Sequence, residues 1–281
     1  MNNQLLTINN LSPIGIFDSG YGGLTILRDI VRELPEHDFL YFGDNARSPY
    51  GTRSFETIYE YTLQCVQYLF SQGCHLVILA CNTASAKALR NIQILDLPHL
   101  APHKRVLGVI RPTTEVIGTL TKTREIGILG TSGTVKSASY LMEINRFWPD
   151  LKVVQQACPM WVPLVENGEL EGAGTAYFVK KYLDAMLAKS NDLDAVLLAC
   201  THYPLLLPMI RSFLSDQIRI ISQGGIVAQS LKDYLRRHPE IDQYCGRSSQ
   251  LIFQTTGDTA DFDGHASQFF GKKINAQKVH L

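Results

Sequence analysis

Two cysteines in this chain of 281 residues, Cys81 and Cys200, follow closely similar apolar runs, LVILAC and AVLLAC. The unperturbed pKa of a thiol is about 8.5, so near neutral pH it can either give or accept a proton. A thiolate and a thiol on opposite walls of a cleft could take a proton from one face of a carbon and return one to the other face. This pair therefore suits the inversion of a carbon that carries an acidic hydrogen.

The other four cysteines do not share this pattern. Cys65 and Cys74 lie in or after a predicted helix and Cys245 lies in a polar loop, so we interpret them as structural. Cys158, before Pro159, ends a predicted strand and could contact a site without taking part in the chemistry. The cysteines have no zinc-site spacing, and the chain is too long and too cysteine-poor for a disulfide scaffold. We expect free thiols in a reducing cytoplasm.

The elements that must position these residues are short apolar runs, each ending in Gly, Ser, Asn, Thr or Cys and most followed by a helix-like segment. They span residues 14–17, 39–42, 76–80, 126–129, 153–157, 195–199, 219–222 and 251–254. Apolar strands that alternate with helices predict an α/β fold with mainly parallel sheets covered on both faces. Ligands bind beyond the carboxyl ends of such strands, where the polar residues of this chain gather.

The chain also contains an internal repeat. LVILACNTASA at residues 76–86 resembles AVLLACTHYPL at 195–205, and GIFDSGYGGLT at 15–25 resembles GILGTSGTVKS at 127–137. The order is the same in both halves, which predicts two pseudo-symmetric α/β domains with a cleft between them. We predict a first domain of residues 1–105 plus 212–281 and a second domain of residues 106–211.

Composition narrows the classes of function. The chain is 45% hydrophobic and 19% charged, and its 26 basic residues balance 26 acidic ones. Without a basic cluster, we expect no nucleic-acid partner. The polar N-terminus does not resemble a secretory signal, and the chain has no apolar run of about 18 residues. We therefore expect a cytoplasmic protein that does not act on a membrane.

Seven segments, in order, resemble the glutamate racemases of the aspartate/glutamate racemase superfamily. They are GIFDSGYGGLT, YFGDNARSPYG, LACNTASA, ILGTSGTVKS, ACPMWVPLVENGE, LLACTHYPLL and FQTTGD. The resemblance implies that the site lies between two similar domains and needs neither pyridoxal phosphate nor a metal. It also implies interconversion of L- and D-glutamate for peptidoglycan synthesis, and a homodimer. Some members are activated by a peptidoglycan precursor.

The resemblance also implies roles for individual residues. Cys81 and Cys200 are the acid/base pair, with Cys81 deprotonating D-glutamate and Cys200 deprotonating L-glutamate. Asp18, on the Cys81 side, and His202, on the Cys200 side, assist the thiols or hold the substrate ammonium, and Glu166 is a further acidic residue of the site. The implied substrate contacts are Asp18, Ser19, Tyr50, Gly51, Asn82, Thr83, Thr131, Thr134, Thr201 and His202.

Structural roles remain open for several of these residues. Asp18, Ser19, Asn82 and Thr83 could cap helices, since these residue types are preferred N-caps. His202 could be a buried, hydrogen-bonded histidine, Glu166 a surface carboxylate and Tyr50 a packing residue.

Two segments depart from the family pattern. They are Ser222-Gln223-Gly224, in place of an Asp-Ser-Gly-like turn, and Arg111 before Pro112. Neither touches the expected chemistry.

Other functions also remain open. An aspartate racemase would carry the same two cysteines, and one methylene in a pocket changes binding by only about 1–3 kcal/mol. A two-lobe amino-acid-binding protein, or a racemase-like protein that binds another macromolecule, would have a similar fold. Replacing either cysteine separates these alternatives, because a binding protein would keep its function.

Overall fold

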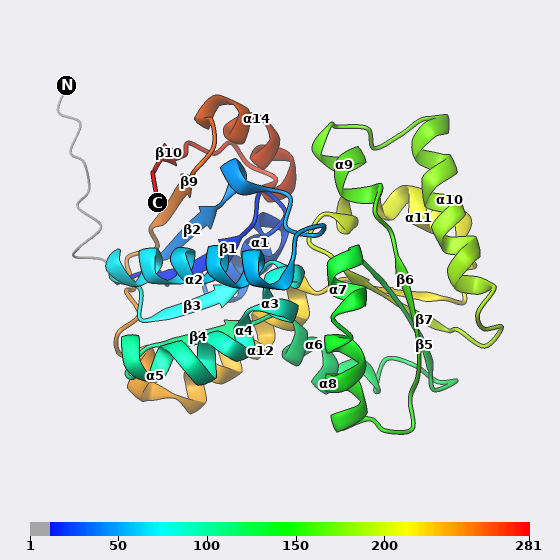
Figure 1. Ribbon diagram of the computed structural model, residues 1–281, viewed down its shortest axis with the longest axis horizontal. Helices are drawn as coiled ribbons and strands as arrows, with labels where there is room; N and C mark the ends of the chain where they lie inside the picture. Colours follow the sequence, from blue (N-terminus) through cyan, green and yellow to red (C-terminus); the bar gives the residue numbers. More distant parts are fainter. Residues whose placement is uncertain (1–11) are drawn as a thin grey trace.

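The computed structural model describes residues 12–281, so the polar N-terminal segment and the start of the first predicted domain lie outside the described residues. The described strands form two sheets that lie side by side (Figure 1), and every strand pair in them is parallel. The first sheet, of order β10-β9-β2-β1-β3-β4, contains β1 (Ile14–Asp18), β2 (Phe39–Gly43), β3 (Leu76–Leu79), β4 (Arg105–Gly108), β9 (Leu251–Thr255) and β10 (Gln277–Lys278). The second sheet, of order β6-β5-β7-β8, contains β5 (Glu125–Gly130), β6 (Lys152–Ala157), β7 (Ala195–Ala199) and β8 (Arg219–Ile221).

Helices connect the strands. Those before β5 are α1 (Leu24–Glu33), η2 (Asn45–Arg47), α2 (Phe55–Ser71), α3 (Asn82–Lys87), α4 (Leu89–Asn91), the π-helical turn η3 (Ile92–Asp96), α5 (Leu97–Leu100) and α6 (Ile110–Ile117). Those between β5 and β8 are α7 (Ser132–Lys136), α8 (Ser139–Phe147), α9 (Trp161–Glu166), α10 (Ala173–Leu187), η4 (Tyr203–Leu206) and α11 (Leu207–Phe213). Those after β8 are α12 (Gly224–Arg237), α13 (Pro239–Asp242) and α14 (Thr259–Phe270).

The strand order confirms the internal repeat and the predicted fold class. Four neighbouring strands of the first sheet follow the order β2-β1-β3-β4, and the second sheet repeats it as β6-β5-β7-β8. β3 and β7 occupy the same place in the two sheets, each beside the first strand of its unit. Because Cys81 and Cys200 follow these two strands closely, the two cysteines are structural counterparts.

The strand pairings do not follow the domain boundaries predicted at residues 105/106 and 211/212. β4 pairs along its whole length with β3 in the first sheet, and β8 pairs with β7 in the second. The predicted bounds assign β8 to the first domain, whereas its strand pairing is with the second sheet. The short connection through η4 and α11 returns the chain parallel to β7, and parallel neighbours linked in this way stay in one sheet. The chain reaches the first domain again only at α12, which packs on α1.

The two domains share an apolar interior. One hydrophobic cluster runs from Leu24 and Ile30 of α1 to Leu198 of β7 and Tyr203 of η4, all of them buried. A cluster of this kind holds neighbouring elements at a defined spacing because protein interiors are close-packed. The shared apolar cluster therefore fixes the spacing of the two domains on either side of the cleft.

Two helices follow β5. The first, α7, begins at Ser132, where the Thr131 side chain accepts a hydrogen bond from the backbone N–H of Thr134. Ala138, with a φ of 54°, separates α7 from α8. The segment after β5 is thus a capped helical turn that places Thr131 at the pocket.

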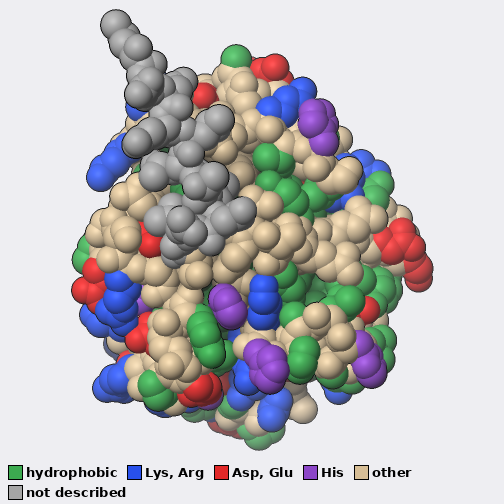
Figure 2. Space-filling model, turned by 90° about the vertical axis from the view of Figure 1, so that its left-hand side faces the viewer, with side chains coloured by type: hydrophobic (Ala, Val, Ile, Leu, Met, Phe, Trp, Pro, Cys, Tyr) green, Lys and Arg blue, Asp and Glu red, His purple; other side chains and the backbone are tan. Residues whose placement is uncertain are grey.

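The end of the first domain that faces away from the second carries mixed side chains. In Figure 2, Lys and Arg are scattered among acidic and hydrophobic side chains over the part of this face that is described. Across residues 12–281, no helix combines the length and the apolar character that a membrane span needs.

Candidate active site

A pocket opens between the two domains at the carboxyl ends of β1, β3, β5 and β7. Its lining consists of Ser19, Ser48, Pro49, Tyr50, Gly51, Thr52, Cys81, Asn82, Thr83, Thr131, Ser132, Cys158, Pro159, Val162, Pro163, Glu166, Cys200, Thr201 and His202. Cys81 comes from the first domain and Cys200 from the second. The structure therefore brings the two counterpart thiols to one pocket.

Cys81 caps the N-terminus of α3. Its sulfur accepts a hydrogen bond from the backbone N–H of Ala84 at 3.5 Å, and its thiol donates to Oγ of Ser19 at 3.6 Å. Burial, together with the nearby carboxylate of Asp18, raises the pKa of Cys81 to about 12. At neutral pH Cys81 is therefore a thiol, the form that can donate a proton.

Asp18 is buried behind the pocket and does not line it. Its Oδ2 accepts the backbone N–H of Gly20 at 3.1 Å, and Thr201 donates to its Oδ1 at 3.5 Å. Burial raises the pKa of Asp18, while the charge of His202 and two backbone N–H groups act in the opposite direction. Asp18 thus links the Cys81 side of the pocket with the Cys200 side.

His202 lies between Cys200 and Glu166. Its Nδ1 is 3.9 Å from Sγ of Cys200, and its Nε2 is 3.1 Å from Oε1 of Glu166, the last residue of α9. Burial lowers the pKa of His202, but the hydrogen bonds and charges of Cys200 and Glu166 outweigh this effect and raise the pKa to about 10. At neutral pH His202 is therefore an imidazolium that donates to both neighbours.

The two sides of the pocket differ in charge. The protonated His202 lies beside Cys200. On the other side, the carboxylate of Asp18 is the charged group that raises the pKa of Cys81 most. A positive neighbour favours a thiolate and a negative neighbour favours a thiol. The two counterpart thiols therefore have neighbours of opposite charge.

The turn after β1 packs closely against the residues that follow Cys200. A Cβ on Gly22 would lie 2.2 Å from Oγ1 of Thr201 and 2.5 Å from Nδ1 of His202, distances that only glycine permits. Thr25 of α1 also donates to the carbonyl of Thr201 at 3.0 Å. The first domain therefore supports the backbone and side chains on the second-domain side of the pocket.

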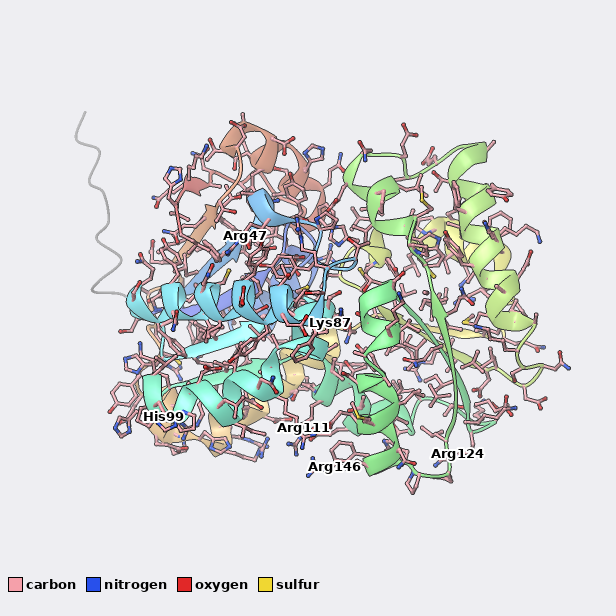
Figure 3. All side chains as sticks on the ribbon, in the orientation of Figure 1. Arg47, Lys87, His99, Arg111, Arg124 and Arg146 are labelled. Atoms are coloured by element: carbon pink, nitrogen blue, oxygen red, sulfur yellow. The ribbon has the colours of Figure 1, made fainter. Side chains whose placement is uncertain are left out.

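The segment from β2 to α2 forms one rim of the pocket. Asp44 is fully buried and accepts hydrogen bonds from the hydroxyl of Tyr50 at 2.5 Å and from Nε of Arg47 at 2.6 Å. Figure 3 shows Arg47 above the N-terminal end of α2, in the first domain. Because the hydroxyl of Tyr50 is occupied by Asp44, Tyr50 faces a ligand with its ring or its backbone.

Hydroxyl groups from both domains meet at another part of the rim. Oγ1 of Thr83 lies 2.9 Å from Oγ1 of Thr131 and 3.4 Å from Oγ1 of Thr134. The backbone N–H of Gly133 also donates to the carbonyl of Gly51 at 2.9 Å. These contacts join the domains directly across the mouth of the pocket.

Most of the residues predicted from the sequence come together here. All of them line the pocket except Asp18 and Thr134, which lie behind it and bond to lining residues. Several further residues line the pocket without a role predicted from the sequence: Ser48, Pro49, Thr52, Ser132, Pro159, Val162 and Pro163. Each lies inside or beside a segment that carries the resemblance, and this position is the signal in the sequence that points to them.

The lining has no Lys or Arg within the described residues. Carboxylates in this pocket would therefore be held by hydroxyl, amide and backbone N–H donors. In the same part of the chain, no group of three His, Cys, Asp or Glu side chains is placed to hold a metal ion.

Comparison with known proteins agrees with this geometry. The family Asp/Glu/Hydantoin racemase matches residues 14–231 of the chain. The glutamate racemase of Persephonella marina is 40% identical over 269 residues, which cover 95% of this chain and 97% of that protein.

Solved structures are similar over nearly the whole chain. The glutamate racemase isoform RacE1 of Bacillus anthracis has a TM-score of 0.86 at 34% identity, covering 96% of this chain and 98% of that one. The enzyme of Francisella tularensis, in complex with D-glutamate, has a TM-score of 0.85 at 29% identity, with coverage of 97% and 98%. The Escherichia coli glutamate racemase, with L-glutamate and the activator UDP-MurNAc-Ala, has a TM-score of 0.75 at 25% identity, with coverage of 94% and 96%. The paired thiols, the repeated parallel sheets and these similarities lead to one conclusion: the chain belongs to the Asp/Glu/Hydantoin racemase family.

Proposed function

We propose that this protein interconverts L- and D-glutamate by proton transfer between the substrate Cα and the thiols of Cys81 and Cys200. The observation that carries the proposal is the placement of these two sulfurs in one pocket, with a cation beside Cys200 and a carboxylate behind Cys81. Relatives named as glutamate racemases, 40% identical over most of the chain, support glutamate as the substrate.

In the proposed mechanism, Cys200 acts as a thiolate on L-glutamate and takes the Cα proton. Cys81, as a thiol, then delivers a proton to the opposite face, and the product is D-glutamate. The reverse reaction exchanges the two roles. His202 stays protonated between Cys200 and Glu166 and stabilises the anionic sulfur.

The difficult step is forming negative charge at Cα. Hydrogen-bond donors aimed at the substrate carboxylate lower the barrier because they stabilise the charge that develops there. Ser19 and Thr83 line the pocket with hydroxyls from the first domain. This chemistry uses only side chains of the protein, so the proposal requires no cofactor.

Incubation of each pure glutamate enantiomer in deuterated water, with no added cofactor, tests the function. We expect the optical rotation to fall to zero while deuterium enters Cα, because the returned proton comes from solvent-exchanged thiol. Aspartate serves as the comparison substrate. Activity on aspartate alone would overturn glutamate as the substrate, and binding of glutamate without inversion or exchange would instead indicate a binding protein.

Its cellular role and partners are also proposals. We propose that the D-glutamate supplies peptidoglycan synthesis and that the protein is a homodimer that does not bind nucleic acid. The Escherichia coli structure with UDP-MurNAc-Ala supports testing this precursor as an activator. Rates measured with and without it test regulation, and sedimentation velocity measures the oligomeric state.

We also propose that the two domains are divided along the two sheets. The first would hold residues 12–108 and 224–281, and the second would hold residues 109–223. The pairing of β4 with β3 and of β8 with β7 supports this division. Expression of residues 109–223 alone tests it, and a folded product would show that this unit is an autonomous domain.

A further inference from the structure

A closed ring of three buried hydrogen bonds connects the domains beside the pocket. The hydroxyl of Tyr140, on α8, donates to Oδ1 of Asn82 at 2.6 Å. Nδ2 of Asn82 donates to Oε1 of Gln223 at 2.7 Å, and Nε2 of Gln223 donates to the hydroxyl of Tyr140 at 2.8 Å. The three residues come from α3, α8 and the turn before α12, so the ring joins segments that are far apart in the sequence.

Gln223 also reaches the start of α6. Its Nε2 lies 3.0 Å from Oγ1 of Thr113 and 3.2 Å from the carbonyl of Val109. With acceptors around its nitrogen and a donor at its oxygen, the Gln223 amide has one favourable orientation. That orientation in turn fixes the Asn82 amide, because Oδ1 of Asn82 must face the hydroxyl of Tyr140.

Burial makes the ring rigid. Asn82 and Gln223 are each 3% exposed and Tyr140 is fully buried. Breaking one bond would leave a polar group unpaired away from water, which costs more than the bond itself contributes on folding. Asn82 directly follows Cys81 and lines the pocket, so the ring holds the first turn of α3 next to the thiol.

We propose that Gln223 is a positioning residue for the reaction: it orients the Asn82 amide beside Cys81 and ties α3 to α6 and α8. This inference rests on the proposed function. Gln223 does not line the pocket and acts only through Asn82. It belongs to the turn Ser222-Gln223-Gly224, which the expected chemistry left without a role.

The chain contains a matched control for this arrangement. Gln254 on β9 is 2% exposed, and its Oε1 accepts a hydrogen bond from the hydroxyl of Tyr68 at 3.0 Å. Neither residue lines the pocket. Gln254→Met therefore removes an equally buried amide, and Tyr68→Phe removes a half-buried hydroxyl, without touching Asn82.

The test compares Gln223→Met and Tyr140→Phe with these two controls in steady-state racemisation of both glutamate enantiomers. A misoriented Asn82 weakens substrate binding, so we expect KM to rise about tenfold in the two ring variants and to stay within about twofold in the controls. Partial unfolding lowers the amount of active enzyme but leaves KM unchanged. KM therefore separates positioning from a purely structural role, and the Tm of each variant measures the structural cost.

An unchanged KM in Gln223→Met, whatever happens to kcat or Tm, would overturn the inference. An equal rise in KM in the control variants would also overturn it, because the effect would not depend on the ring. Wild-type protein, assayed in parallel, separates the two proposals: a wild type that does not racemise glutamate overturns the proposed function and this inference with it. Racemisation by the wild type with an unaffected Gln223→Met overturns the inference alone.

Discussion

Cys81 and Cys200 are equivalent in the fold but have different neighbours. The thiol of Cys81 donates to Ser19, and the carboxylate of Asp18 raises its pKa. Cys200 lies beside the imidazolium of His202. Two identical environments would favour the same protonation state at both sulfurs. The difference in neighbouring charge distinguishes the two sulfurs, and in the proposed mechanism it gives each thiol its own testable role.

Single cysteine variants should separate the two half-reactions. In Cys81→Ala, Cys200 can still remove the Cα proton of L-glutamate and return deuterium to the same face, but nothing protonates the other face. We expect exchange of L-glutamate without inversion, and the opposite specificity in Cys200→Ala. Racemisation should fall about 1,000-fold or more in each.

Proton NMR in deuterated water measures exchange, and polarimetry measures inversion. Cys74→Ala, which changes a buried thiol outside the pocket, should keep wild-type rates. Full racemisation in either active-site variant would contradict the two-thiol mechanism.

The raised pKa of His202 predicts how stability depends on pH. The folded protein holds this proton with a pKa of about 10, against 6.5 for an unperturbed histidine. The stabilising contribution is therefore complete below about pH 6.5 and is lost progressively as the pH rises through the folded value. Between pH 6.5 and 9, the free energy of unfolding should fall more steeply in wild type than in His202→Asn.

Urea unfolding at several pH values measures this difference. Cys81, whose pKa is also raised, adds a loss of stability of the same sign above the unfolded thiol pKa of about 8.5, and this contribution cancels because wild type and His202→Asn share it. Parallel pH profiles in wild type and His202→Asn would show that His202 is not the protonated group.

At the scale of elements, the site depends on the turn between β1 and α1. This turn places Asp18 behind the pocket and brings Gly22 against Thr201 and His202. The end of β1 and the start of α1 depend on the local sequence. The close approach of Gly22 to Thr201 and His202, in contrast, joins elements of different domains. The turn thus couples the placement of Asp18 to the placement of His202.

Gly22→Ala should disrupt this coupling. The added methyl group would overlap Oγ1 of Thr201 and Nδ1 of His202, so one of these side chains or the turn itself must move. A shift of about 1 Å in a catalytic group can cost about 100-fold in rate, and we expect a loss of this size in kcat/KM.

Gly174→Ala provides the control, because a Cβ at that position on α10 meets no atom within 4 Å. Racemisation assays and Tm measurements on both variants test the prediction. Equal activity of Gly22→Ala and wild type would show that the contact is not needed for the reaction.

At the scale of the whole molecule, the pocket is built from both domains. β3 presents Cys81 from one sheet and β7 presents Cys200 from the other, while an apolar cluster and the Thr83–Thr131 contact hold the sheets together. A ligand in the pocket would touch both domains and add contacts between them. Binding should therefore stabilise the folded protein as a unit.

D-glutamate should raise the Tm of the wild-type protein. A ligand present at 100 times its Kd contributes about 2.7 kcal/mol to stability, which corresponds to a rise of about 5 °C or more in a chain of this size. D-lysine, which lacks the side-chain carboxylate, should leave Tm unchanged. Differential scanning calorimetry measures both, and an equal shift with the two amino acids would contradict specific binding between the domains.

Local patterns in the sequence were enough to predict the α/β class, the repeat and the two counterpart cysteines. This succeeds because apolar strand runs and the polar residues at their ends depend on neighbouring positions in the chain. For the same reason, Ser19, Asn82 and Thr201 could be placed at the carboxyl ends of strands. The choice among glutamate, aspartate and simple binding was not accessible in this way, and the resemblance alone favoured glutamate.

Other features of this protein arise only in the folded chain. The tertiary structure decides that His202 bonds to Glu166, that the hydroxyl of Tyr50 is occupied by Asp44, and that β8 joins the second sheet. It also closes the ring through Gln223, a residue 141 positions from Asn82. The sequence by itself determines which residues stand at the ends of the strands, because that information is local. The charges and hydrogen bonds around the two thiols come from contacts between distant segments, and only folding brings those segments together.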